Sequence, residues 1–255
     1  IEEIRRCFGT NIRTAETIAR EAEDMTLQAR METLLLPRIQ DFSPYLRIEG
    51  ALAPGALVLH PSVAAAPILH AALAHRWPGL VVFRARGFAE TGTGPWKASW
   101  LNRQAQKRRQ KEEAQLPILW EENPRQLAYH LQNGKRVIVA LDDRSFRRFY
   151  PVDFLGQKVW LSPEPWEAAA LAHAPLQSAT ICRDRDRVLQ ITLGAPYQIS
   201  PENIHRAMQQ WISTRVEPWL QLHPGSYAIW LAECRIRSTS APHPLYQFDT
   251  NAFSR

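Results

Sequence analysis

The sequence has few cysteines, and none of them lie close together. Cys7, Cys182 and Cys234 are spread over 255 residues and include no C-x-x-C pair. Three cysteines cannot all be paired within one chain, and this spacing does not fit a structural zinc site. The pattern is typical of a reducing compartment, so we expect a cytoplasmic protein without a bound metal.

Long apolar runs and several catalytic motifs are also missing. No window approaches the roughly 18 consecutive apolar residues that indicate a membrane-spanning helix. The glycine-rich stretch at residues 87–94 is not followed by Lys and Ser or Thr, as a P-loop requires, and no G-x-S-x-G motif occurs. We therefore expect no membrane-spanning segment, no bound cofactor, and neither P-loop nor serine-hydrolase chemistry.

Acidic residues are outnumbered by basic ones. The chain has 31 Lys and Arg against 25 Asp and Glu, which gives a net charge of +6. This balance favours anionic partners, such as a phosphate-bearing substrate, an acidic lipid surface or nucleic acid. The basic run at 103–113 ends in glutamates and has no nucleic-acid recognition motif, so we interpret it as a solvated or membrane-facing helix and consider nucleic acid the least favoured partner.

Short apolar runs alternate with helical patterns from residue 55 onward. Expected strands cover residues 56–60, 80–84, 116–120, 136–143, 176–183 and 187–194, and expected helices cover residues 66–77, 98–114, 123–132, 163–174 and 200–224. This alternation indicates βαβ units with buried parallel strands. We predict an α/β fold, a single domain with a mostly parallel central sheet flanked by helices.

The remaining segments divide the chain further. We expect an N-terminal helical segment at 1–50, with one or two amphipathic helices in residues 1–40. A connection at 41–54, rich in turn residues, leads from it to the core. The core covers 55–235, with an aromatic and basic loop at 144–160, and the last residues, 236–255, form an irregular tail.

Polar side chains stand where the expected strands end. His60 joins the first strand of the core to the helix that follows, Arg84 and Arg86 lie at the end of the second strand, and Asp142 and Asp143 end the clearest strand. Because ligands bind at the carboxyl edge of open parallel sheets, we predict a functional site there. Each residue also has an ordinary interpretation, as a helix-capping or packed histidine, a solvated arginine or a turn-forming acid.

Several stretches, taken in order, resemble the lysophospholipid acyltransferase superfamily, and most closely the bacterial lipid A late acyltransferases. "GALVLHPSVAAAPILHAALAHR" resembles the strand–histidine–helix segment of the family, "HLQNGKRVIVALDDR" its helix and strand ending in Asp-Gln, and "YPVDFLG" its V-x-F-F-G loop. The resemblance implies acyl transfer from acyl-CoA or acyl carrier protein to a lipid hydroxyl, at the inner membrane face. It also implies that Arg84 contacts phosphate and that Asp142 corresponds to the aspartate of Asp-Gln.

The catalytic signature of the family, H-x4-D/E, is incomplete. His60 aligns with the family's histidine, but Ala65 stands five residues later, and none of the other histidines has a carboxylate at that spacing. A general-base histidine needs the carboxylate to fix its tautomer and to stabilise the imidazolium. Two hypotheses follow: a non-catalytic member that binds a lipid or a protein partner, or an active O-acyltransferase in which His60 uses a substitute carboxylate such as Asp142.

Two further features stay open at this stage. Ser62 lies at the expected start of a helix, where an N-cap is favoured over a nucleophile. Residues 146–151, "FRRFYP", mix arginine with aromatic rings. Such a mixture suits a membrane interface, an acyl groove or an ordinary packed loop.

Overall fold

The computed structural model describes residues 2–10, 12–35, 39, 41–63, 65–83, 118–121, 123–143, 146–184 and 188–227. The predicted basic helix at 98–114, the arginines at 84 and 86, and the predicted tail at 236–255 lie outside these residues.

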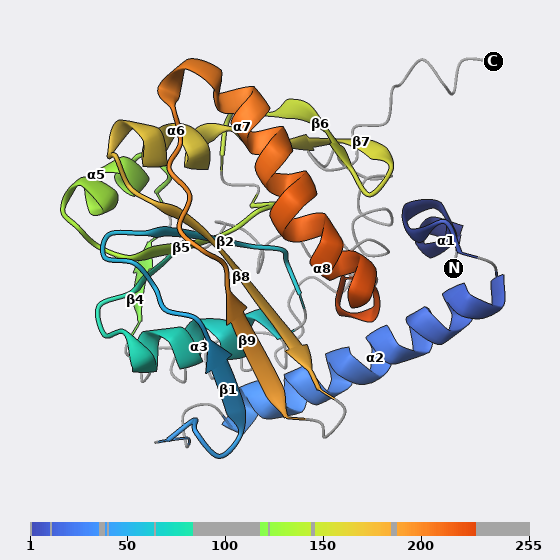
Figure 1. Cartoon of the computed structure of the whole chain (residues 1–255). Helices are drawn as coiled ribbons and strands as arrows, with labels where there is room; N and C mark the ends of the chain where they lie inside the picture. Colours follow the sequence, from blue (N-terminus) through green and yellow to red (C-terminus); the bar gives the residue numbers. More distant parts are fainter. Residues whose placement is uncertain are drawn as a thin grey trace, which may run out of the picture.

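A seven-stranded sheet forms the centre of the molecule, with strand order β1-β9-β8-β2-β5-β3-β4 (Figure 1). The strands are β1 (Leu46–Glu49), β2 (Leu57–His60), β3 (Val81–Phe83), β4 (Leu119–Glu121), β5 (Val137–Ala140), β8 (Leu176–Arg183) and β9 (Leu189–Leu193). Every neighbouring pair is parallel except β8 and β9, which are antiparallel. The predicted α/β fold with a mostly parallel sheet is therefore confirmed.

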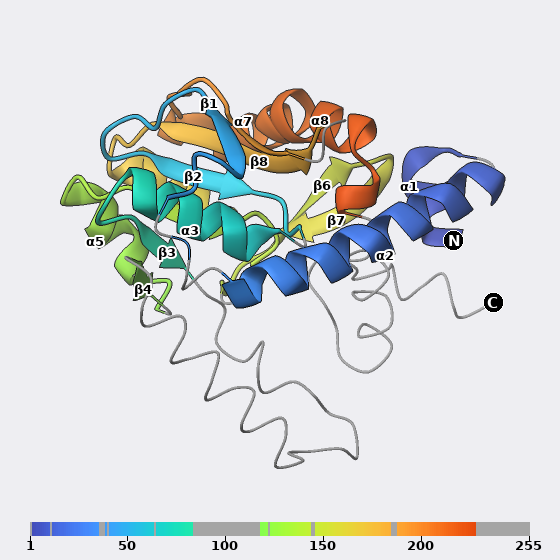
Figure 2. The ribbon, with the colours of Figure 1, turned by 90° about the horizontal axis from the view of Figure 1, so that it is seen from below.

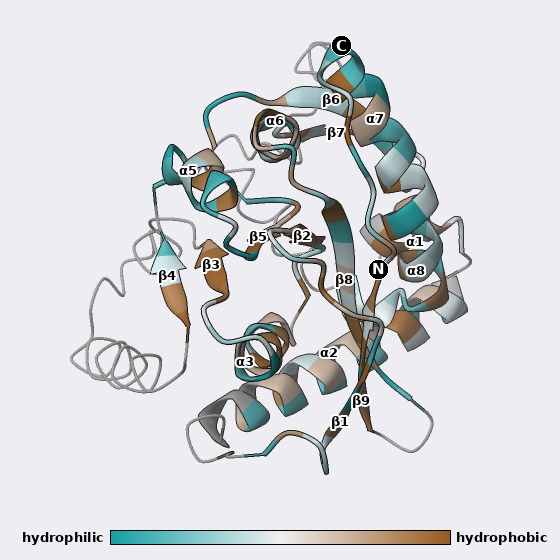
Figure 3. Ribbon diagram, turned by 60° about the vertical axis from the view of Figure 1, so that its left-hand side comes forward, coloured by the Kyte–Doolittle hydropathy of each residue, from teal (hydrophilic) through white to brown (hydrophobic). Residues whose placement is uncertain are grey.

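Helices cover both faces of this sheet. Figures 2 and 3 show α2 and α3 on one face and the α7–α8 segment on the other. The helices are α1 (Glu2–Phe8), α2 (Ile12–Leu35), α3 (Ala66–Arg76), α5 (Gln126–Gln132), α6 (Glu164–Leu171), α7 (Ile204–Trp211) and α8 (Glu217–Leu222). Among the helices that the structure describes, none combines the length and the apolar character needed to cross a membrane.

The central strands β2, β3 and β5 are apolar except for His60 at the end of β2, and Figure 3 shows their hydrophobic character. In β2, Leu57, Val58 and Leu59 have no exposed surface, because β5 and β8 flank the strand and helices cover both faces. α3 presents Ala71, Ala72 and Ala74 as well as larger side chains to the interior, and these small residues let the helix lie close to its neighbours. A polar residue at the end of β2 therefore enters a dense apolar core.

The two N-terminal helices have a small core of their own. Ile4 of α1 packs with Ala15, Ile18 and Ala22 of α2, and this cluster is separate from the large one around the sheet. The C-terminal half of α2 joins the main body, where Ala29 belongs to the large cluster. The prediction of helices in residues 1–40 is confirmed by α1 and α2.

Two predicted loops contain strands instead. The segment at 41–54 contains β1, a short edge strand whose residues alternate between buried and more exposed positions. The segment at 144–160 contains most of an antiparallel hairpin of β6 (Tyr150–Phe154) and β7 (Gln157–Leu161). Pro151 and the charged residues obscured the hairpin, since proline is confined to edge positions of sheets. The backbone at its turn is left-handed, with φ of 50° at Leu155 and 71° at Gly156.

The long helix predicted at 200–224 is divided. A 3-10 turn (Pro201–Asn203) precedes α7, and a π-helical turn (Ile212–Val216) separates α7 from α8. Pro218 lies two residues after this π turn. A proline inside a helix removes one backbone donor and crowds the preceding turn, and a π turn is a common way to accommodate this.

The glycines at 50 and 79 allow a test of how tightly the segment before β2 is packed. Both have a left-handed backbone, with φ of +88° at Gly50 and +83° at Gly79. A Cβ at Gly50 would lie 2.7 Å from the Leu193 carbonyl oxygen, whereas a Cβ at Gly79 would meet no atom within 4 Å.

We expect Gly79→Ala to lower the free energy of unfolding by about 1–2 kcal/mol, the cost of a left-handed alanine. Gly50→Ala carries the same cost plus a backbone clash, and it should lose at least about 1 kcal/mol more. Urea unfolding of the two variants measures the difference, and equal losses would contradict the close approach of residue 50 to β9.

Candidate functional site

His60 lies at the carboxyl end of β2, with only 2 % of its surface exposed. Its carbonyl oxygen accepts a hydrogen bond from the Leu141 amide at 2.7 Å, which continues the pairing of β2 with β5. Pro61 follows and has no amide hydrogen, so the ladder ends here. The histidine is thus fixed at the last position of a central strand and inside the protein.

Both ring nitrogens of His60 have partners. Nδ1 lies 2.9 Å from the carbonyl oxygen of Pro61, and Nε2 lies 3.0 Å from Nε2 of His70 on α3. A carbonyl oxygen can only accept, so Nδ1 of His60 carries the proton and Nε2 carries the lone pair. His70 must then donate from its own Nε2. The two rings meet edge to face, with centroids 4.9 Å apart.

The environment keeps this histidine pair neutral. Burial lowers the pKa of His60 to about 4, although the hydrogen bond to Pro61 partly opposes the shift. Burial also lowers the pKa of His70 well below its ordinary value, and repulsion from a charged His60 would lower it further. A ring with so low a pKa is a weak general base at neutral pH.

Ala65 occupies an apolar environment. It is the N-cap residue of α3 and has 8 % of its surface exposed. Its side chain borders a cavity of about 10 Å³, enough for roughly one water molecule. The cavity is lined mainly by apolar side chains, which come from α2, β8, β9 and the residues just before α3: Met25, Ala29, Val63, Ala65, Ile181, Cys182, Arg183 and Leu189. A cavity of this size cannot take a carboxylate and its hydration.

Asp142 follows β5 and is nearly buried, with 6 % of its surface exposed. One of its oxygens, Oδ1, accepts a hydrogen bond from the Ser62 hydroxyl, which joins the segments that follow β2 and β5. The prediction of Ser62 as a helix N-cap is wrong, because α3 begins at Ala66 and its N-cap is Ala65. Ser62 lies before the start of α3 and donates to Asp142 instead.

The structure therefore brings part of the predicted site together. His60 and Asp142 lie at the ends of the adjacent strands β2 and β5, as the strand-end argument predicted. Arg84 and Arg86 fall outside the described residues. The partners that sequence reasoning missed are His70 and Ser62. The sequence contains little evidence for the contact of His70 with His60, because two histidines ten residues apart on either side of a connection form no recognisable motif.

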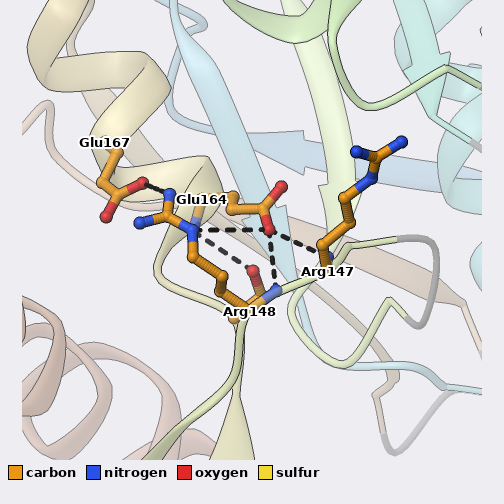
Figure 4. Close-up of polar contacts among 5 residues, drawn as sticks. Arg147, Arg148, Glu164 and Glu167 are labelled. Carbon is orange, nitrogen blue, oxygen red and sulfur yellow. Dashed lines mark hydrogen bonds and ion pairs between the residues drawn. The ribbon is translucent and has the colours of Figure 1, made fainter.

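The "FRRFYP" segment is partly a packed loop. Phe146 is buried, and the backbone amides of Arg147 and Arg148 both donate to Glu164 Oε1 at 2.8 Å. The Arg148 guanidinium pairs with Glu167 and Glu164 of α6, whereas Figure 4 shows the Arg147 guanidinium extending away from both carboxylates. The charge of Arg148 is thus compensated within the protein.

The part of the chain that the structure describes contains no group of three or more His, Cys, Asp and Glu side chains arranged to hold a metal ion. The histidine pair and the Ser62–Asp142 pair are the polar contacts that characterise this edge of the sheet.

The protein is an α/β protein with an open, mostly parallel sheet, and His60 and Asp142 lie at the ends of two adjacent strands. The family model for the bacterial lipid A biosynthesis acyltransferases matches residues 90–233, more than half of the chain. The chain therefore belongs to this family. Comparison with curated proteins gives no match.

The matched range begins after β3 and ends after α8, so Asp142 lies inside it, whereas His60 and Ala65 precede it. The correspondence of these two residues to the family's histidine and carboxylate rests on the resemblance of the strand and helix around them. Both assignments stay predictions.

Acid should destabilise the protein through the histidine pair. The folded-state pKa of His60 is about 4, below the ordinary 6.5, so the unfolded chain binds the proton first as the pH falls. The stability contributed by neutral His60 is complete above pH 6.5 and is lost progressively down to pH 4. The shift corresponds to about 3 kcal/mol.

Urea unfolding at pH values between 7 and 4 measures this loss. The free energy of unfolding should fall less steeply with falling pH in His60→Gln than in the unaltered chain. It should fall equally steeply in His205→Gln, a control at an exposed histidine. If His60→Gln retained the full slope, the acid sensitivity would come from other groups.

Ser62→Ala should lower the free energy of unfolding by about 1–3 kcal/mol, because it removes a donor to a nearly buried carboxylate. Ser200→Ala is the matched control, since that hydroxyl makes no capping hydrogen bond, and it should change stability by less than about 0.5 kcal/mol. Thermal or urea unfolding compares the two variants. Equal effects would show that the contact between Ser62 and Asp142 contributes no stability.

Proposed function

We propose that this chain is a non-catalytic member of the lipid A biosynthesis acyltransferase family that binds anionic lipid at the cytoplasmic face of the inner membrane. The observation that carries the proposal is the state of His60. Its ring is buried, its Nδ1 donates to a backbone carbonyl, and its Nε2 accepts from His70.

Acyl transfer to a hydroxyl demands more than a histidine. The base nitrogen must come within about 3 Å of the acceptor hydroxyl, with its lone pair free. A carboxylate must hold the ring and stabilise the imidazolium, and disabling that carboxylate in a serine protease lowers kcat by about 10⁴. In this chain Ala65 stands at the expected carboxylate position, and the lone pair of His60 Nε2 is directed at His70.

The lipid-binding part rests on family membership and charge. The net charge of +6 favours an anionic surface, and the predicted contacts are Arg84 and Arg86 after β3. Arg147 adds a guanidinium that points away from the carboxylates of α6 (Figure 4). A protein is the alternative binding partner, and nucleic acid is the least favoured one.

The alternative function is an active O-acyltransferase that uses acyl-CoA or acyl carrier protein as donor. Asp142 favours it, because a nearly buried carboxylate lies at the end of the strand next to His60. However, Asp142 Oδ1 accepts from Ser62, and the two ring nitrogens of His60 have Pro61 and His70 as partners.

An acyl-transfer assay separates the two functions. The purified protein is incubated with labelled acyl-CoA or acyl carrier protein and with lysophospholipid or lipid A precursor acceptors. We expect no transfer above that of His60→Ala. Transfer by the unaltered chain that is abolished in a normally folded His60→Ala variant would establish the active alternative.

Vesicle sedimentation tests the lipid-binding part. We expect binding to vesicles that contain anionic phospholipid, weaker binding at high salt, and little binding to zwitterionic vesicles. The double variant Arg84→Ala/Arg86→Ala should bind about tenfold or more weakly, at roughly 1 kcal/mol per arginine near the surface.

The matched control is Arg13→Ala/Arg20→Ala, which removes the same charge from exposed positions on α2. It should bind nearly as well as the unaltered chain. Equal losses in the two double variants would reduce the effect to net charge, and equal binding to both kinds of vesicle would refute anionic-lipid recognition.

A further inference from the structure

A catalytic histidine needs a fixed tautomer and a lone pair that points at the substrate. In this chain His60 has the first but not the second, because of its contact with His70. In a His–carboxylate pair the carboxylate accepts from one ring nitrogen, which fixes the tautomer, and the other nitrogen points its lone pair at the substrate. Here the carbonyl of Pro61 accepts from Nδ1 and fixes the same tautomer. The lone pair on Nε2 is therefore present but directed at His70.

We propose that His70 is a positioning residue that blocks the basic nitrogen of His60. It donates its Nε2 proton to the Nε2 lone pair of His60, which is the nitrogen that a general base would use. This inference rests on the proposed non-catalytic function and gives it a structural cause besides Ala65. The chain then has two separate obstacles to acyl transfer, and a carboxylate restored at position 65 leaves the second one in place.

The scaffold holds His70 in this position. Its neighbours on α3, Leu69 and Ala71, are buried, with 0 % and 1 % of their surface exposed, and Leu73 is fully buried one turn later. α3 in turn contacts α2 and β8. Because the helix is anchored on these sides and His60 ends a central strand, the backbone segments that carry the two rings are held in fixed positions relative to each other.

The distance between the rings fits a hydrogen bond better than a shared metal ion. Two imidazole nitrogens on one tetrahedral zinc, each at about 2.0–2.1 Å, would be about 3.3 Å apart. The observed separation is 3.0 Å, within the range for an N–H donor, and no third ligand completes a site among the described residues.

Nitrogen NMR of the full chain labelled with ¹⁵N-histidine tests the contact directly. We expect His60 to be protonated on Nδ1 only, and a ¹⁵N–¹⁵N coupling to join the Nε2 atoms of His60 and His70 across the hydrogen bond. The His60→Gln variant assigns the signals. This measurement on the unaltered chain needs no other variant to fold.

Two variants at residue 70 separate positioning from simple packing. His70→Leu removes the donor, so the Nε2 signal of His60 should shift to that of an unbonded acceptor nitrogen. His70→Gln keeps an N–H donor and should return the signal most of the way to its original position. A structural role without a hydrogen bond would make the two variants equivalent.

The inference would be overturned by a proton on His60 Nε2, by the absence of coupling between the two rings, or by an unchanged His60 signal in folded His70→Leu. Stoichiometric shifts of both rings on adding Zn²⁺ would also overturn it, in favour of a shared metal. The acyl-transfer assay is independent. Activity in the unaltered chain would refute the proposed function even with the coupling present, and inactivity without the coupling would refute only the role of His70.

Discussion

The dominant constraint on this molecule is the burial of polar side chains at the end of an apolar central strand. β2 is flanked by β5 and β8, and helices cover the sheet, so a histidine at its last position cannot be solvated by water. Its hydrogen-bonding groups must be satisfied by the protein, since an unpaired buried polar group costs about 1–3 kcal/mol. The Pro61 carbonyl and the His70 ring meet this requirement and determine the protonation state of His60.

Much of the fold could be predicted because the sequence patterns of its central strands, which are short apolar runs, differ clearly from those of its helices. β8 has the predicted bounds, and the apolar cores of β2 and β5 fall within the predicted runs. β1 and the β6–β7 hairpin could not be predicted from apolar runs. Each is paired on a single side or carries a proline and charged residues, and their stability comes from partners distant in the sequence, such as β9 for β1.

The site was predictable to the level of strands but not of contacts. The alternating pattern places His60 and Asp142 at one edge of the sheet, because parallel neighbours end together. The contacts depend on which face of α3 meets the end of β2 and on where Ser62 lies after that strand. That geometry turns Ser62 toward Asp142 and His70 toward His60, and neither the spacing of the motif nor composition contains it.

The separate apolar cluster of α1 and the first half of α2 gives the chain two levels of cooperativity. Ile4, Ala15, Ile18 and Ala22 form a patch far smaller than the core around the sheet, and few buried contacts mean a low free energy of local opening. α1 and the first half of α2 are therefore expected to open locally at a lower free energy than the strands of the sheet. Exchange of their amide hydrogens through such an opening would report the stability of this small cluster and not that of the sheet.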